Sequence, residues 1–312
     1  MDERTTTGPE TIGGARMPGR MVLAIASGKG GTGKTLVATN VAALAAAQGY
    51  RVLLADCDVE APNDHLFFDR TVESASLVEV PVAEVDASAC TSCGRCRDAC
   101  AYGAVRLLGG SAIVFEELCH GCGLCTDVCD EGAMHESLRR VGEVACGPVR
   151  DRSGLSLITG TLDVGQVKSP ALIRAVRAAG STFDADLVVL DSPPGVACSA
   201  VAAVRGADAL LLVTEPTEFG LHDLELSVRL GHDLALTMAV LVNRDGSGGI
   251  DVARACEGWN VPVVGRLPFA RRIAEVYAQG GIVVDGMPEV ARALSSLPDV
   301  MRSLAARGRG RR

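Results

Sequence analysis

The sequence predicts an α/β protein built on a doubly wound, mostly parallel sheet, with a small α+β domain inserted into it. Short runs rich in Val, Leu and Ile alternate with helical patterns, which indicates parallel strands covered on both faces. Eight of the twelve cysteines form two runs of identical spacing, and this local change in composition indicates the insertion. A glycine-rich segment between the first apolar run and the first helical pattern indicates a phosphate-binding loop.

The expected strands and helices follow in order along the chain. Strands are expected at 21–26, 52–55, 187–190, 209–213, 238–242 and 261–264. Helices are expected at 36–47, 172–179, 221–230 and 290–304, and Pro298 interrupts the last of them. Ligands of such sheets bind beyond the carboxyl ends of the strands, so the residues after each apolar run are the candidate site residues.

Composition limits the functional classes. The 312 residues are 48% hydrophobic and 22% charged, as in a soluble globular protein, and the net charge of −8 argues against nucleic-acid binding. Neither a secretory signal nor an apolar run of about 18 residues is present, so we expect a cytoplasmic protein without a stable membrane anchor. The expected divisions are a disordered leader (1–20), a sheet domain in two parts (21–83 and 141–306), the inserted domain (84–140) and a basic tail (307–312).

The two cysteine runs share the pattern C-x2-C-x2-C-x3-C, displaced by 29 residues. This pattern resembles that of bacterial ferredoxins with two [4Fe-4S] clusters, in which the fourth cysteine of each run ligates the other cluster. The resemblance implies one cluster on Cys90, Cys93, Cys96 and Cys129. It implies a second cluster on Cys119, Cys122, Cys125 and Cys100.

Two other interpretations of the cysteines are less consistent with their spacing. Zinc sites favour two separated C-x2-C pairs, and a disulfide framework requires a secreted chain. The sequence departs from the ferredoxin pattern after each fourth cysteine, where Ala101 and Asp130 replace the usual proline. A carboxylate directed at a cluster would disfavour its reduction, so the potentials are left open.

The glycine-rich segment fits G-x-x-x-x-G-K-[ST] in the strand–loop–helix context that this motif requires. It reads Gly28-Lys29-Gly30-Gly31-Thr32-Gly33-Lys34-Thr35. The backbone N–H groups of such a loop bind phosphates, and Lys34 is expected at the β- and γ-phosphates. Thr35 is expected to bind Mg²⁺.

The second lysine of the motif, Lys29, resembles the deviant Walker A signature of the MinD/ParA/Mrp superfamily. This resemblance implies an ATPase whose active form is a homodimer, with Lys29 reaching the partner's nucleotide. It also implies that Asp58 activates the attacking water and that Asp191, in Asp191-Ser192-Pro193-Pro194-Gly195, acts on Mg²⁺ through water. A buried structural aspartate at a strand end is the alternative for each.

The base is expected to be adenine. Asn243 and Arg244 follow a strand and resemble the adenine-edge position of the superfamily, and Pro268 resembles part of the loop that completes the adenine pocket. A guanine-specific N-K-x-D motif would place Asp at position 246, where this chain has Gly246. ATP and ADP are therefore expected as ligands.

Four cysteines lie outside the two runs: Cys57, Cys146, Cys198 and Cys256. Burial as small apolar side chains is the default for each. Cys198 lies seven residues after Asp191 and resembles a ligand of the intersubunit cluster of the nitrogenase iron protein, but its expected companion position, Val167, is not a cysteine. A third cluster would thus need unusual ligation.

Three functions fit these features. The first is electron transfer through the two clusters, controlled by nucleotide-dependent dimer closure and serving a redox partner. The second is ATP-dependent assembly or delivery of a cluster to a client metalloprotein. The third is a MinD-like positioning ATPase. Permanent ligation by eight cysteines favours electron transfer, because a delivered cluster requires labile ligands.

Overall fold

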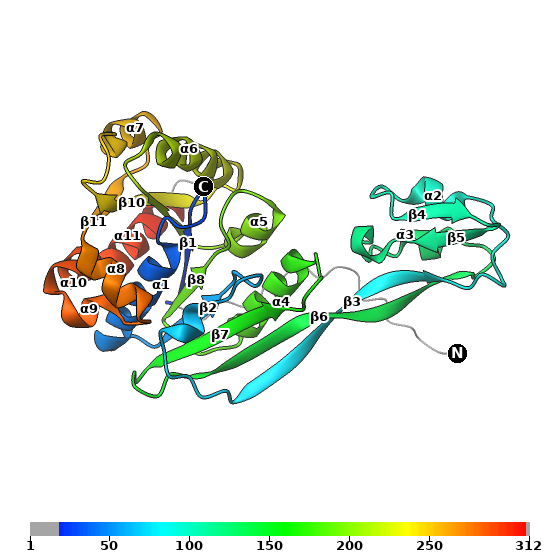
Figure 1. Cartoon of the computed structure of the whole chain (residues 1–312), viewed down its shortest axis with the longest axis horizontal. Coiled ribbons are helices and arrows are strands. Elements are labelled where there is room, and N and C mark those ends of the chain that lie inside the picture. The colour runs from blue at the N-terminus through cyan, green and yellow to red at the C-terminus, as the bar shows by residue number, and fades with distance from the viewer. Residues whose placement is uncertain (1–18, 310–312) are drawn as a thin grey trace.

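A nine-stranded sheet forms the centre of the molecule in this computed structural model, which describes residues 19–309 (Figure 1). Its strand order is β11-β10-β9-β1-β8-β2-β7-β6-β3. The strands from β11 to β7 run parallel, whereas β6 is antiparallel to both of its neighbours. The parallel strands are β1 (Met21–Ala26), β2 (Val52–Asp56), β7 (Leu155–Leu162), β8 (Leu187–Asp191), β9 (Ala209–Thr214), β10 (Thr237–Asp245) and β11 (Val263–Pro268).

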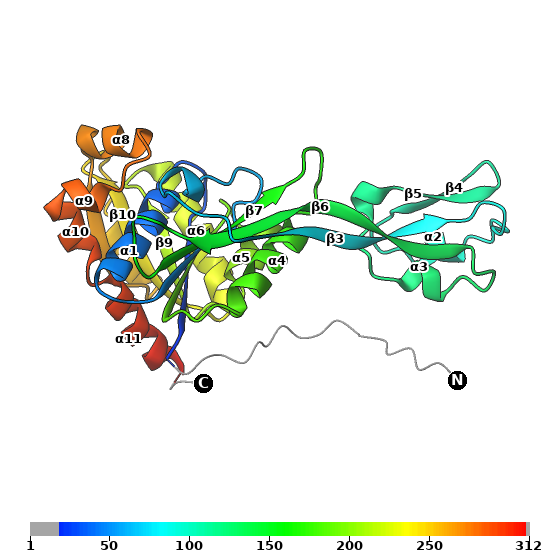
Figure 2. The same cartoon turned by 90° about the horizontal axis from the view of Figure 1, so that it is seen from below.

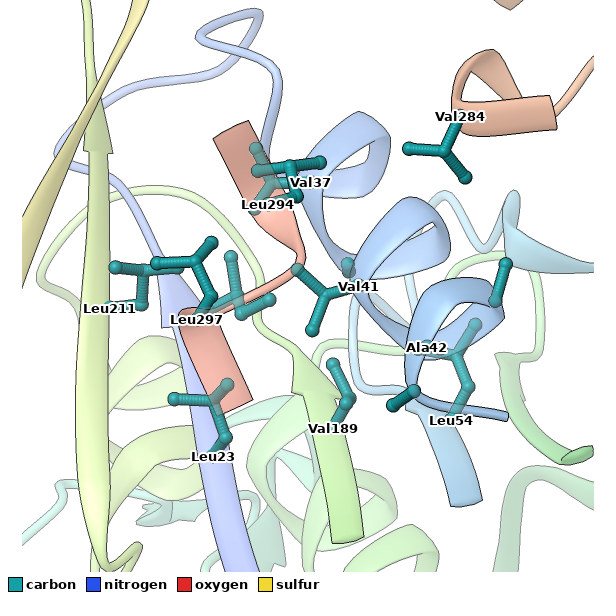
Figure 3. Close-up of a cluster of buried hydrophobic side chains, with 14 of the residues drawn as sticks. Leu23, Val37, Val41, Ala42, Leu54, Val189, Leu211, Val284, Leu294 and Leu297 are labelled. Carbon is teal, nitrogen blue, oxygen red and sulfur yellow. The ribbon is translucent and has the colours of Figure 1, made fainter. Parts of the chain in front are cut away.

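Helices cover both faces of this sheet, so alternate strand residues enter two separate cores. One core, shown in Figure 3, joins Val37 and Val41 of α1 to Leu23, Leu54 and neighbouring strand residues. The helices on this side are α1 (Lys34–Ala47), α8 (Arg271–Ala278), α9 (Val283–Gly286), α10 (Pro288–Leu294) and α11 (Leu297–Arg309). Those on the other side are α4 (Ser169–Ser181), α5 (Cys198–Val204), α6 (Glu218–Asp233) and α7 (Val252–Gly258). The predicted doubly wound arrangement is confirmed.

The remaining long strands, β3 (Ser74–Val85) and β6 (Met134–Pro148), form a twisted antiparallel ribbon that leaves the main domain. Their register runs from Ser74 opposite Cys146 to Val85 opposite Met134. Figure 2 shows that the ribbon carries the cysteine-rich segment away from the main domain on its far end. This segment, residues 86–133, is called the insert below.

The insert has a small core of its own. It contains α2 (Arg95–Ala99), α3 (Leu124–Asp127), the 3₁₀ turn Glu116–Leu118, and the hairpin of β4 (Val105–Leu108) and β5 (Ser111–Val114). Cys96, Val105 and Ala112 are buried together with Ala83 and Met134 from the ribbon. Five further cysteines of the two runs pack against this core, so sulfur-bearing side chains make up much of its surroundings.

Several expected boundaries differ from the observed ones. The inserted domain was expected at 84–140, but the ribbon pairs residues on both sides of those limits. Pro298 divides the expected 290–304 helix into α10 and α11, because proline is accepted in the first turn of a helix and not in its interior. Most of the leader (1–18) and residues 310–312 of the tail lie outside the described residues, whereas Arg307–Arg309 continue α11.

Within residues 19–309, none of the helices is both long and apolar enough to cross a membrane.

Asn40 of α1 provides a test of how the C-terminal helices are attached. Its side-chain oxygen accepts the backbone N–H of Val284 at 2.9 Å, and both residues are buried. We predict that Asn40→Ala lowers the free energy of unfolding by about 1–3 kcal/mol in urea titrations, because a buried N–H loses its partner. The control is Gln48→Ala, which removes an exposed bond to Ser295 and should cost less than about 0.5 kcal/mol. Equal effects would contradict the assignment.

Candidate functional site

The glycine-rich loop lies where β1 ends and α1 begins, at the carboxyl edge of the parallel strands. Gly33 is left-handed at φ 98° and directly precedes α1, whose first residues are Lys34 and Thr35. A Cβ on Gly33 would lie 2.3 Å from the Asn243 amide nitrogen, and one on Gly28 would lie 2.2 Å from the Asp223 carbonyl oxygen. Glycine is therefore required at both positions by the backbone and side chains packed against the loop.

Thr35 and Asp191 meet at this edge. The Thr35 hydroxyl donates to Asp191 Oδ2 at 2.6 Å, although the two residues are 156 positions apart. Asp191 is 1% exposed, and its other oxygen has no hydrogen-bond partner among the described residues. Burial raises the pKa of Asp191 to about 6, while the charge of Lys34 opposes this shift. An aspartate and a hydroxyl so placed fit a Mg²⁺ site in which the cation offsets the buried charge.

Two further buried carboxylates, Asp56 and Asp64, lie beside this pair and were not singled out from the sequence. Asp56 accepts the backbone N–H groups of Asp58, Asn63 and Asp64, at 2.9–3.1 Å. Burial, followed by the charge of Asp191, raises the pKa of Asp56 to about 8. The turn after β2 is therefore held by one carboxylate. In the sequence, Asp56 could have been identified by its position at the end of a predicted strand.

Asp64 lies inside this turn, and among residues 19–309 no N–H or hydroxyl group donates to either of its oxygens; its carboxyl group lies beside that of Asp191. It is fully buried, and burial together with the charges of Asp56 and Asp191 raises its pKa well above the usual range. Asp58, in contrast, is partly exposed. Burial also raises its pKa, against the opposing charge of Lys34. The charges of Asp58 and Lys34 are thus close enough to influence each other.

Lys29 is held within its own chain. Its ammonium group pairs with Glu215 Oε1 at 2.6 Å, and Arg244 pairs with Glu215 Oε2 at 2.9 Å. Burial alone would raise the pKa of Glu215, but the two cations keep it below the usual value. Glu215 was not among the predicted site residues, because the loop after β9 carries no recognisable nucleotide motif and was expected to be structural.

The predicted base-binding residues lie at the same edge of the sheet. The Asn243 amide donates to the Thr32 carbonyl at 2.7 Å, and the Arg244 guanidinium donates to the Gly31 carbonyl at 3.0 Å. Both residues thus brace the glycine-rich loop. Pro268 ends β11 opposite Asp245 of β10 and is exposed.

The insert brings cysteines from different runs together. Cys90, Cys93 and Cys96 line a small cavity with Cys129, which belongs to the other run. In the second run, Cys125 lies close enough to Cys119 and Cys122 for their charges to raise its pKa, after the larger effect of burial. Among residues 19–309, no group of three or more metal-binding side chains is gathered as tightly as one metal ion requires.

Backbone N–H groups point at three of these sulfur atoms. Ala112, Ala104 and Ala83 donate to Cys90, Cys100 and Cys119 at 3.4, 3.2 and 3.5 Å, respectively. The bond from Ala112 is the largest of the effects that lower the pKa of Cys90. Such bonds favour the thiolate, which is the form that binds metals.

Charged residues of the insert pair with one another. The Arg95 backbone N–H and guanidinium lower the pKa of Cys93, and the same guanidinium forms an ion pair with Asp130. The carboxylate in the usual proline position therefore has a cationic partner. Of the four remaining cysteines, Cys57 and Cys256 are buried as expected, Cys146 is partly buried, and Cys198 is exposed at the start of α5.

Comparisons with known proteins agree with this fold. Residues 23–283 match the family model described as the CobQ/CobB/MinD/ParA nucleotide binding domain. The chain is 31% identical to the uncharacterized protein MJ0578 of Methanocaldococcus jannaschii, over 90% of this chain and 96% of that protein. It is 22% identical to the uncharacterized ATP-binding protein MJ0547 of the same organism, over 92% and 89%.

Solved structures show the same architecture. The septum site-determining protein MinD of Pyrococcus horikoshii, complexed with Mg-ADP, superimposes with a TM-score of 0.57. Its sequence is 20% identical to this one, and the match covers 93% of this chain and 98% of that chain. At this level of identity the likeness shows a shared fold.

Two glycines of the loop form a matched pair for mutagenesis. A Cβ on Gly28 meets the Asp223 backbone, whereas one on Gly30 meets no atom within 4 Å. We predict that Gly28→Ala destabilises the protein by about 1–3 kcal/mol and weakens nucleotide binding, because the loop and α6 must separate. Gly30→Ala should leave the free energy of unfolding within about 0.5 kcal/mol of wild type. Urea unfolding and calorimetric ADP titration provide the comparison, and an equal response of the two variants would refute it.

Proposed function

The chain belongs to the CobQ/CobB/MinD/ParA nucleotide-binding family, and we propose that it is an ATPase that couples nucleotide-dependent dimer closure to electron transfer through two [4Fe-4S] clusters. The observation that carries the proposal is the shared cavity of Cys129 with Cys90, Cys93 and Cys96. In ferredoxins with two clusters, the fourth cysteine of each run likewise joins the first three cysteines of the other run. On this proposal the nucleotide loop and the insert act together.

The predicted nucleotide-binding residues at the carboxyl edge of the sheet each have a separate role. Loop N–H groups and Lys34 bind the phosphates of ATP, and Thr35 and Asp191 hold Mg²⁺, Asp191 through water. When bound, Mg²⁺ neutralises charge on the β- and γ-phosphates. Asp58 orients the attacking water, which its partial exposure beside Lys34 supports. Asn243, Arg244 and Pro268 form the adenine side, which favours ATP over GTP.

The iron–sulfur half assigns Cys90, Cys93, Cys96 and Cys129 to one cluster and Cys119, Cys122, Cys125 and Cys100 to the other. When bound, the clusters supply one-electron redox chemistry. The chain's own contribution is to present thiolates and to direct backbone N–H groups at the sulfurs of Cys90, Cys100 and Cys119. Exposure of Cys93 and Cys122 places one edge of each site toward solvent, where a redox partner has access.

Dimer closure assigns a role to the ion pair of Lys29. In the single chain, Glu215 holds Lys29 at 2.6 Å. For Lys29 to reach the nucleotide of a partner subunit, this pair must open. We therefore propose that Glu215 restrains Lys29 until a second ATP-bound chain supplies phosphate oxygens in its place.

A second candidate is ATP-dependent assembly of clusters for a client metalloprotein. The exposed thiol of Cys198, at the start of α5, favours it, because a transferred cluster requires accessible and labile ligands. Electron transfer ranks above it, since eight cysteines are committed within the insert. A positioning role like that of MinD has support from the shared fold alone.

Iron content tests the proposal directly. We predict about eight irons per chain after anaerobic purification, with reducible [4Fe-4S] spectra. Cys93→Ser and Cys129→Ser should perturb the same spectral component, whereas Cys100→Ser should perturb the other one. Cys146→Ser, outside both runs, is the control and should retain full iron. Stoichiometric zinc without iron after anaerobic reconstitution would reject the clusters.

The two lysines should separate binding from closure. We predict that Lys34→Ala weakens ATP binding by about tenfold or more, equivalent to about 1.4 kcal/mol, because it loses a direct phosphate contact. Lys29→Ala should keep ATP binding yet lose ATP-dependent dimerisation and hydrolysis. Calorimetry, light scattering and phosphate release measure the three properties. Hydrolysis by Lys29→Ala at the wild-type rate would show that Lys29 has no role in the partner's site.

A further inference from the structure

A lysine of the main domain contacts the insert. Lys168, immediately before α4, donates from its ammonium group to the carbonyl oxygen of Cys119 at 2.6 Å. The contact lies in a cleft of about 1080 Å³, one wall of which is formed by α4 and α5 and the other by residues near the second cysteine run. Lys168 is partly buried, so its charge acts on the Cys119 segment with less screening than a fully exposed lysine would experience.

The next residue, Ser169, connects the same point to the nucleotide side of the molecule. Its buried hydroxyl donates to Glu60 Oε1 at 2.5 Å. Glu60 lies two residues after Asp58, in the turn whose backbone N–H groups donate to Asp56. Because Glu60 also lies at the amino end of the 13-residue α4, its negative charge is favoured there by the helix dipole.

A backbone contact ties the same two segments together. The Leu162 N–H donates to the Val59 carbonyl at 2.9 Å, and Val59 is 1% exposed. A Cβ on Gly160 would lie 2.7 Å from Val59 and 2.5 Å from Val176, so β7, α4 and the turn pack without spare space. A shift of the turn therefore has to move the segment that ends in Lys168 and Ser169.

We propose that Glu60, Ser169 and Lys168 form a relay that transmits the nucleotide state from the turn after β2 to the second cysteine run. The relay deepens the function proposed above, since it rests on Cys119 being a cluster ligand. Lys168 and Ser169 are positioning residues, because neither lies among the residues assigned to ATP. A change at Asp58 displaces Glu60, Ser169 follows the carboxylate, and Lys168 changes its hold on Cys119.

Two physical consequences follow for the second cluster site. A cation near a cluster favours the reduced form, which carries one more negative charge, so movement of Lys168 alters the balance between oxidised and reduced states. Release of the Cys119 carbonyl also loosens the loop that carries Cys122. Coupling of this kind is reciprocal, so reduced and oxidised protein should bind ATP with unequal affinity. A twofold difference corresponds to about 18 mV for one electron.

The ribbon is the competing route. It joins the insert to the main domain covalently and begins at Ser74, after the turn. A signal through the ribbon would reach both cysteine runs, since β3 leads into the first run and β6 leaves the second. The relay reaches the second run alone, and this difference separates the two routes.

Hydrogen–deuterium exchange of the anaerobically purified full-length protein tests the relay, with and without a non-hydrolysable ATP analogue. We expect the analogue to change the exchange rate of residues 115–123 at least about twofold in wild type, with residues 90–100 changing less. Lys168→Met and Ser169→Ala should abolish this change while retaining ATP binding, and Lys168→Arg should restore it. Arg174→Met is the matched control, because Arg174 is an exposed cation of α4 that lines the same cleft.

The relay is overturned if the analogue leaves residues 115–123 unchanged in wild type, or if Lys168→Met retains the full response. An equal response of both cysteine runs that survives in Ser169→Ala would assign the signal to the ribbon and overturn it as well. Iron analysis of the same samples tests the clusters independently, because deuterium uptake reports the movement whether or not iron is bound. The two proposals can therefore fail separately. In samples that contain iron, we also expect nucleotide to change the reduction potential of the wild-type protein and not that of Lys168→Met.

Discussion

Buried negative charge at the carboxyl ends of β2 and β8 is the constraint on which the site depends. Asp56 and Asp191 occupy paired positions on these neighbouring strands, and Asp64 is folded in beside them. Three carboxylates cannot all ionise in such surroundings without a cation, which is why burial raises the pKa of each. The same charges make the edge receptive to Mg²⁺, and Asp56 also shapes the turn containing Asp58. The proposed binding and switching would thus both depend on one cluster of acids.

This arrangement explains why the turn after β2 can respond to a nucleotide. Its backbone N–H groups depend on Asp56, whose ionisation depends on the charge beside it. A cation at Asp191 changes that charge directly. The turn also reaches Ser169 through Glu60, so an electrostatic event at the phosphates has a short mechanical path toward the insert. The fold couples the two halves by contact as well as by covalent connection.

Local sequence patterns predicted the parallel core strands and the glycine-rich loop, because buried strands are continuous apolar runs and loop glycines have fixed spacing. The β7 strand was missed, since Ser156, Thr159 and Gly160 interrupt its apolar pattern. The β3–β6 ribbon was missed for a different reason: much of β3 is exposed on both faces and contains Pro81, so neither alternation nor apolarity identifies it. Glu215 and Asp64 acquire their partners only through tertiary contacts, and no local pattern identifies them.

If the chain closes into a dimer as proposed, the Lys29–Glu215 pair adds an energetic threshold to that closure. An ion pair that is largely buried on the glutamate side holds the lysine in its own chain, and Arg244 fixes the same glutamate to the loop through the Gly31 carbonyl. Each increase of about 1.4 kcal/mol in the free energy that favours the pair lowers the population of unpaired Lys29 tenfold. In the proposed arrangement, Lys29 contacts the nucleotide of the partner subunit and not that of its own chain. Phosphate oxygens of the partner's nucleotide must therefore displace Glu215, and an isolated chain has no such phosphate for its Lys29. Under the proposed function, this pair would restrain closure until a second nucleotide-bound subunit arrives, and the proposed relay to Cys119 would respond to the turn on either side of that threshold.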